Sequence, residues 1–310
     1  MVRICSLLPS ATEILCALGL GDQIVAVSHE CDYPLEILGL PKITKSLVDP
    51  SSLSSAEINA LVTESIESAL PLYQLDAELL RILRPELIVT QDLCLVCAVE
   101  GGQVRQAAST CSPGAQLISL HIGSVDDLWQ AIQTLGEATC VPNSAGDLVT
   151  KLKVRLDLVR RAVDGANRAR VLCLEWLDPP WIAGHWMPRA VEIAGGQALL
   201  ADADTPSRRV TWGEIAAARP DAVIVMPCGF DVERTLREVH VLNAVPEFAQ
   251  LPAVQQGHVH VVDGSAYFNR AGPRLVDGIE ILAGLLHPDL VSRTVDRRVA
   301  IELGSSGVPI

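Results

Sequence analysis

The sequence lacks the features that mark membrane-spanning and secreted proteins. No run of eighteen apolar residues occurs in the 310-residue chain, which argues against a membrane-spanning helix. The first residues, Met1 to Leu8, show no basic region followed by an apolar stretch and a small-residue cleavage site. The nine cysteines are odd in number and scattered, unlike a disulfide framework. These absences predict a cytoplasmic protein with reduced thiols, or a periplasmic one if a leader has been removed.

Basic charge and catalytic motifs are also missing. The formal net charge of −13 argues against nucleic acid and anionic membranes as partners. The chain contains no phosphate-binding GxxxxGK[ST] loop, no GxGxxG after its first apolar segment, no GxSxG elbow and no HExxH. Carboxylates occur in the loops, but their pairing cannot be read from the sequence. Nothing in the sequence indicates catalysis directly.

A long amphipathic segment, residues 143–166, is the most regular feature that is present. Apolar Leu148, Leu152, Leu156 and Val159 recur at three- and four-residue steps, as on one face of a helix. A helix of this length spans roughly 33 Å, about one small domain. The pattern predicts a single helix that joins two lobes. An ordinary crossover helix within one large sheet remains the alternative.

Short apolar segments alternate with helical patterns on both sides of this helix. They predict strands at 3–7, 24–28, 87–90 and 116–120, then at 170–174, 222–226 and 258–262. Such alternation is typical of α/β folds with parallel sheets. We expect an N-terminal α/β lobe at 1–142, the connecting helix at 143–167, a C-terminal α/β lobe at 168–290 and a tail at 291–310. The resemblance of Arg84-Pro85 and its following strand to Arg219-Pro220 and its strand suggests a duplication.

Aromatic residues are scarce, and most of them follow predicted strands. Of eleven aromatic residues, seven lie in such loops: Tyr33, Trp176, Trp181, Trp186, Phe230, Tyr267 and Phe268. Ligands of open parallel sheets bind beyond the carboxyl ends of the strands. The distribution indicates a large, flat, partly apolar ligand. Packing between the lobes is the alternative explanation.

Two groups of residues are candidate metal ligands. Cys94 and Cys97 form a CxxC, and His29 and Cys31 come from another loop at the same predicted sheet edge. Zinc or iron binding, redox chemistry and inert buried cysteines all stay open. His185, between Gly184 and Trp186, is a candidate axial ligand of a metal chelate, or else a capping or core residue.

Several motifs resemble the class III substrate-binding proteins, the vitamin B12 and iron-siderophore type with a helical backbone. The resemblance rests on residues 6–13, 18–34, 84–88, 194–196, 212–224 and 272–275 and covers roughly residues 1 to 288. Segments 29–34, 91–99 and 175–186 are most similar to a leaderless subgroup of cobalamin-binding proteins.

The resemblance implies two Rossmann-like lobes joined by a single long backbone helix, with cobalamin or another corrinoid held between them. Carried over by position, the residues lining that site would be Tyr33, Trp181, Trp186, Trp212 and Phe268, with Arg270 near the polar edges of the ligand. Transporter-linked members dock to an ABC permease through a surface glutamate on each lobe, and Glu100 and Glu233 lie near the corresponding tips. The missing leader speaks against such docking.

The main hypothesis is therefore a non-enzymatic binding protein for a corrinoid or a related metal chelate. The alternative is a metal- or thiol-dependent enzyme on the same scaffold that uses His29, Cys31, Cys94 and Cys97. An exported transport component is a third possibility.

Overall fold

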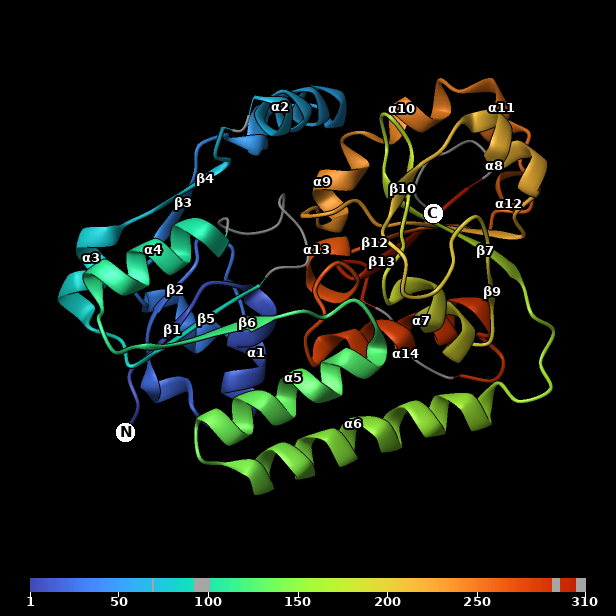
Figure 1. The fold of residues 1–310 in the computed structure, drawn as a ribbon. Helices are drawn as coiled ribbons and strands as arrows, with labels where there is room; N and C mark the ends of the chain where they lie inside the picture. The colour runs from blue at the N-terminus through green and yellow to red at the C-terminus, as the bar shows by residue number, and fades with distance from the viewer. Residues whose placement is uncertain (69, 92–100, 292–295, 305–310) are drawn as a thin grey trace. The chain divides into compact units, whose positions relative to one another are not determined.

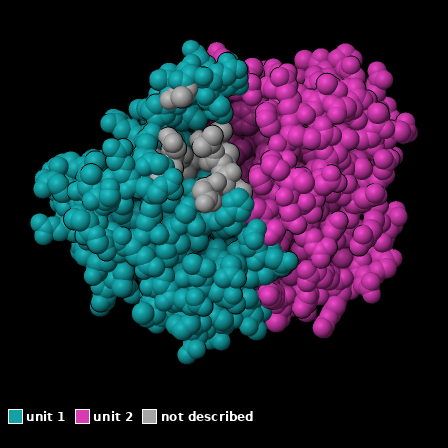
Figure 2. All heavy atoms as spheres, viewed as in Figure 1, with its two compact units in different colours: residues 1–53, 60–122, 126–151 teal, residues 54–59, 123–125, 152–310 magenta. Residues whose placement is uncertain are grey.

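The computed structural model describes residues 1–68, 70–91, 101–291 and 296–304, which form two compact units (Figure 1, Figure 2). The first unit contains residues 1–53, 60–122 and 126–151, and the second contains 54–59, 123–125 and 152–310. Two short segments of the second unit, 54–59 and 123–125, thus lie within the sequence of the first unit. The predicted lobes, 1–142 and 168–290, do not separate these segments from the first lobe. In the described part of the chain, no helix combines the length and the apolar character needed to cross a membrane.

The first unit is built on a four-stranded parallel sheet. Its order is β2 (Ile24–Val27), β1 (Ile4–Ser6), β5 (Leu87–Gln91) and β6 (Gln116–Leu120). The helices of this unit are α1 (Pro9–Ala17), α3 (Ala77–Leu83), α4 (Gly101–Cys111) and, after its first residue, α5 (Val125–Ala138). The helix α2 (Ser55–Glu67) begins in the second unit and belongs to the first from Ala60 onward. Strands covered on both faces need continuous apolar runs, and β1 and β5 have them. On one face, Leu80 of α3 and Val104 of α4 pack against Ile88 of β5.

A separate two-stranded antiparallel sheet adds to this unit beyond the predicted strands. It pairs β3 (Thr44–Ser46) with β4 (Tyr73–Leu75), opposing Thr44 to Leu75. Short 3₁₀ turns lie at η1 (Gly21–Gln23), η2 (Leu35–Gly39) and η3 (Pro50–Ser52). β3 lies within residues 41–55, a stretch rich in Pro and Ser that resembles a loop in the sequence. Two three-residue strands separated by 26 residues leave little local signal.

The long helix α6 (Pro142–Ala162) confirms the predicted connecting element. It is one continuous helix, and its residues pass from the first unit to the second after Lys151. Leu152, Leu156 and Val159 are buried as the periodicity predicts, whereas Leu158 is 60% exposed and lies off that face. Within the second unit, Arg155 forms ion pairs with Asp277 and Glu280 of α14, which fasten the C-terminal half of α6.

The second unit has a larger mixed sheet. Its order is β10 (Arg208–Arg209), β8 (Trp181–Ile182), β7 (Arg170–Trp176), β11 (Ala222–Val225), β12 (Val259–Val262) and β13 (Ala300–Leu303), with β9 (Gln197–Ala198) beside β7. The strands β7, β11 and β12 run parallel, and β8, β10 and β13 pair antiparallel. The α/β prediction, with two Rossmann-like lobes and one connecting helix, is confirmed.

Helices of the second unit are mostly short. They are α7 (Met187–Ile193), α8 (Trp212–Ala218), α9 (Val232–Leu236), α10 (Val239–Asn243), α11 (Pro246–Ala249), α12 (Pro252–Gln255), α13 (Gly264–Tyr267) and α14 (Arg274–Leu286). Beyond α14, residues 300–303 are strand β13 and pair with β12. The prediction of a tail from residue 291 was therefore wrong there, because four residues at a sheet edge gave no clear periodicity.

The two units end a helix and begin a strand with the same backbone device. Arg84 after α3 has φ 47° and ψ 59°, and Arg219 after α8 has φ 46° and ψ 64°. Both residues take the left-handed conformation that commonly ends a helix, and each precedes a proline that cannot continue it.

The acidic residue after each proline then joins the neighbouring strand. Glu86 accepts the backbone N–H of Arg3 at 2.9 Å and donates its own N–H to the Arg3 carbonyl at 2.8 Å. Asp221 makes the same two bonds to Arg170, at 2.9 Å and 2.8 Å. The repeat seen in the sequence is therefore also a repeat of hydrogen bonding at the amino ends of the sheets.

Candidate functional site

The segment between β8 and α7 of the second unit is tightly fixed. Gly184 lies so close to residues 205–207 that an added Cβ would be 2.5 Å from the Pro206 carbonyl carbon and 2.6 Å from the Ser207 nitrogen. Its N–H donates to the Ser207 hydroxyl at 3.1 Å. The following residue, His185, has φ 51°, and its N–H donates to the Thr205 carbonyl at 2.5 Å. A non-glycine residue in this conformation is uncommon and needs such support.

His185 and Trp186 form a layered pair at this point. The two rings stack with centroids 5.8 Å apart at 29°. Trp186 is 8% exposed, and its indole N–H donates to the Phe268 carbonyl at 2.8 Å. Phe268 itself is fully buried. Trp186, held by the Phe268 carbonyl, therefore supports half-buried His185, and His185 is the most accessible of the three residues.

The remaining aromatic candidates of this unit differ in exposure. Trp181 is half-buried in β8, opposite Trp176 of β7. Trp212 begins α8 and meets Phe248 edge-on at 5.8 Å, against the apolar core of the unit. Trp212 therefore packs against the core, whereas Trp181 lies at the carboxyl end of β7, where a ligand could reach it.

Carboxylates and arginines gather after β11 and β12. Asp231 and Asp263 cap α9 and α13, accepting the N–H groups of Arg234 at 2.7 Å and Ala266 at 2.8 Å. Burial raises the pKa of Asp263, and the nearby charge of Asp231 raises it further, while arginines including Arg270 oppose the shift. Arg270 therefore serves as a local counter-charge at this edge of the sheet.

In the first unit, the predicted ligands His29 and Cys31 are bound to other groups. His29 Nδ1 lies 2.7 Å from the Thr44 hydroxyl, and Nε2 lies 3.3 Å from Glu30 Oε1. The Cys31 sulfur is buried, 3.1 Å from Thr12 Oγ1 and 3.3 Å from Ser28 Oγ. Burial raises the pKa of Cys31, although the two hydroxyls oppose that shift. The structure thus favours a protonated, structural thiol here.

No group of three or more His, Cys, Asp or Glu side chains among the described residues is arranged to hold a metal ion. Cys94, Cys97 and Glu100 lie outside the described residues. The metal ligands predicted from the sequence stay a prediction, because the structure describes the neighbours of His29 and Cys31 only.

Tyr33 follows β2 and is 44% exposed. Its accessibility is consistent with a role in contacting a ligand. The neighbouring residues Leu35 and Leu38 are also exposed, at 75% and 50%.

The sequence did not predict a cavity of about 530 Å³ in the first unit, beside β4 and α4. Its polar lining includes Tyr73, Gln74, Gln103 and Gln106, and none of the described residues that line it is charged. The Tyr73 ring lies 5.3 Å from His29, so the cavity adjoins the loop after β2. It is open to the surface rather than enclosed. The cavity is lined by three segments that are distant in the sequence, at Leu47, residues 71–77 and residues 103–110. Sequence periodicity does not show that such segments meet.

Comparison with known proteins gives a consistent result. A family model described as a periplasmic binding protein matches residues 4–266. A vitamin B12-binding protein of Vibrio cholerae is 25% identical over 281 residues, covering 90% of this chain and 86% of that protein. An uncharacterized ABC transporter substrate-binding lipoprotein of Bacillus subtilis is 24% identical, covering 93% and 80%. The solved periplasmic heme-binding protein of Vibrio cholerae has a TM-score of 0.69 at 21% identity, covering 93% of this chain and 99% of that one, and shows likeness of fold.

These comparisons overturn the prediction of a cytoplasmic protein. The matching family is periplasmic, and one relative is a lipoprotein. The prediction depended on the pattern of residues Met1 to Leu8, which lead into strand β1, and on the scattered cysteines.

Proposed function

Because the chain belongs to the periplasmic binding protein family, we propose that it binds a corrinoid or a related metal chelate outside the cytoplasm and performs no reaction on it. The vitamin B12-binding relative and the heme-binding structural neighbour both take flat metal chelates, which supports this class of ligand. Relatives from ABC transporters support delivery of the ligand to a permease. Glu233, exposed on α9, is a candidate docking residue on the second unit.

One structural observation carries the proposal for the ligand class. His185 is held in a left-handed conformation on the Trp186 ring, and Trp186 is fixed by the Phe268 carbonyl. A half-buried imidazole on a rigid support is suited to ligate the metal of a chelate that stacks nearby, because little conformational freedom is lost on binding. We propose His185, Trp181, Tyr33 and Arg270 as ligand contacts. Trp186 would act by positioning His185, and Phe268 by holding Trp186 through its carbonyl. Trp212 packs against Phe248, and its predicted ligand contact stays a prediction.

The enzyme alternative has less support. Burial raises the pKa of Cys31 and so disfavours the thiolate that thiol chemistry needs. Cobalamin and heme enter the proposal as ligands because of the relatives that bind them. Zinc or iron at His29, Cys31, Cys94 and Cys97 stays a prediction, because Cys94 and Cys97 lie outside the described residues.

An absorbance titration with aquocobalamin, repeated with hemin, tests the proposal. We expect saturable binding with a shift of the visible bands, because imidazole ligation alters the electronic spectrum of the metal. His185→Ala should abolish the band shift and weaken binding roughly tenfold, about 1.4 kcal/mol. His258→Ala is the matched control, since His258 is exposed just before β12, at the amino end of that strand. An unchanged shift in His185→Ala would remove His185 from the metal, and no binding of either chelate would contradict the proposed function.

A further inference from the structure

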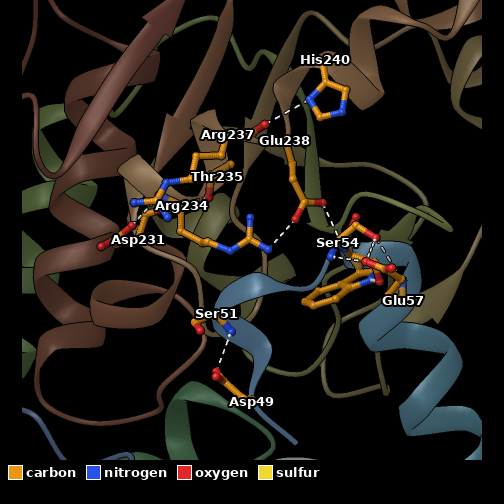
Figure 3. A network of polar contacts seen from close by, with 12 residues as sticks. Asp49, Ser51, Ser54, Glu57, Asp231, Arg234, Thr235, Arg237, Glu238 and His240 are labelled. Atoms are coloured by element: carbon orange, nitrogen blue, oxygen red, sulfur yellow. Dashed lines mark hydrogen bonds and ion pairs between the residues drawn. The ribbon is translucent and has the colours of Figure 1, made fainter.

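Residues 54–59 belong to the second unit although the residues on both sides of them belong to the first. They include Ser54 and the first turn of α2, and we call them the strap. Figure 3 shows the strap beside Arg234 and Glu238 of the second unit.

The strap is bound to the second unit through its first helical amide. The N–H of Ser55 donates to Glu238 Oε2 at 2.8 Å. Ser55 is 1% exposed and Glu238 is 4% exposed, and the other carboxylate oxygen pairs with Arg234 at 2.5 Å. The first amides of a helix have no partner within the helix, and a carboxylate there is also favoured by the helix dipole. This is a charge-assisted bond in a position shielded from water.

A second bond joins the strap to the aromatic residues after the strands. The indole N–H of Trp176, at the end of β7, donates to the Ser55 carbonyl at 3.1 Å. The Trp176 ring lies 5.2 Å from the ring of Phe230, which follows β11. The Arg234 guanidinium lies 4.2 Å above the same Phe230 ring. The strap, the aromatic pair and the Arg234–Glu238 ion pair therefore form one connected group.

The strap also has internal support. Glu57 Oε2 accepts the N–H and the hydroxyl of Ser54, both at 2.8 Å, and the Ser54 hydroxyl accepts the Glu57 N–H at 3.3 Å. This reciprocal capping keeps the first turn of α2 intact without help from Glu238 or Trp176. The turn can therefore leave Glu238 and Trp176 as a folded piece.

We propose that the strap covers the indole N–H edge of Trp176, beside Phe230, and is displaced when a ligand stacks on the Trp176 ring. The proposal rests on the proposed function, since the displacing ligand is a flat metal chelate. Trp176 and Phe230 follow β7 and β11, at the sheet edge where ligands of such folds bind. A ligand that needs this surface must compete with the strap, so the observed affinity is reduced by the fraction of molecules in which the strap is bound.

Hydrogen–deuterium exchange of residues 54–59 tests the proposal on the full chain. Aquocobalamin should increase exchange in this segment. Glu238→Gln removes the charge that holds the Ser55 amide and should raise exchange without added ligand, and it should tighten aquocobalamin binding about five- to tenfold. Ser55→Pro removes the amide donor itself at a helix position that accepts proline, and it should act in the same direction. Glu247→Gln is the matched control, an exposed carboxylate on α11, and should change neither quantity.

Distinct results would overturn distinct claims. Slower exchange in residues 54–59 with aquocobalamin would mean that the strap clamps the ligand, and the proposal would be wrong. Unchanged exchange in both Glu238→Gln and Ser55→Pro, measured without ligand, would overturn the strap while leaving the proposed function intact. Failure to bind any chelate would overturn the proposed function and, with it, displacement of the strap.

Discussion

The two units are alike at one edge of their sheets and different at the other. At the amino ends, Glu86 and Asp221 tie the entering strand to Arg3 and Arg170 with matching bonds. At the carboxyl ends, the first unit surrounds the Cys31 thiol with hydroxyls, whereas the second has aromatic rings and carboxylates that cap helices. The same scaffold therefore holds its strands in the same way and carries different chemistry where the strands end.

The two units therefore offer different kinds of surface. The carboxyl edge of the second unit offers rigid aromatic surfaces, which suit stacking against a flat ligand. The first unit offers an uncharged cavity beside Tyr73, which suits neutral hydrogen-bonding groups. Three changes test the comparison, in order of decreasing expected effect.

The largest effect should come from Gly184→Ala in the second unit. The added methyl group would meet the backbone of residues 205–207, which cannot move aside as a side chain can. We expect the free energy of unfolding to fall by about 3 kcal/mol, measured by urea denaturation. Gly213→Ala is the control, because its nearest atom to an added Cβ is Thr211 Oγ1 at 3.9 Å. Equal stability of the two variants would contradict the claim that this loop is rigid.

A smaller effect should follow from acid, through His260 of β12. Burial lowers the pKa of His260 from 6.5 to about 4, and the charge of His258 adds to the shift. A histidine whose pKa is lowered by folding is neutral in the folded protein, so stability is lost as the pH falls from 6.5 through 4. Between pH 7 and pH 4, His260 should account for a loss of about 2 to 3 kcal/mol.

His260→Gln should remove that part of the pH dependence, as measured by denaturation at each pH. His258→Gln, at an exposed position, is the comparison and should retain most of it. Hydrogen exchange at pH 4 should locate the weakening in the second unit. A pH profile shared by wild type and His260→Gln would refute the assignment.

The smallest effect tests the likeness of the two amino edges. Glu86→Ala and Asp221→Ala each remove one acceptor of a backbone N–H. Each should cost about 1 kcal/mol, and the two losses should agree to within about 0.5 kcal/mol, because the bonds match. A large inequality in denaturation midpoints would show that the repeated geometry does not carry repeated energetics.

Much of the fold could be predicted because its signals are local. The apolar step of Leu152, Leu156 and Val159 determines a helix face, and the Arg-Pro pairs mark where helices stop. The two-stranded sheet of β3 and β4 and the edge strand β13 were missed. Each of these strands is three or four residues long and pairs with residues distant in the sequence.

The site was less predictable for the same reason. The sequence predicts a site at the strand ends, but it does not reveal that Phe268 is fully buried or that His185 has a positive φ. Nor does it show that Trp176 and Glu238 bind Ser55, more than 100 positions away. Such facts depend on close packing between distant segments. Accessibility and partners, rather than residue type, decide which candidates can meet a ligand.

Strand β13 has a consequence for solubility. It pairs antiparallel with the whole of β12, opposing Val259 to Leu303 and Val262 to Ala300. Without it, a fully buried apolar strand would become an open sheet edge, which can recruit another chain and start aggregation. The four-residue strand that takes its place at the edge is short and carries Glu302, two properties that discourage further pairing. Removing the residues after α14 should therefore expose the edge of β12 and promote aggregation.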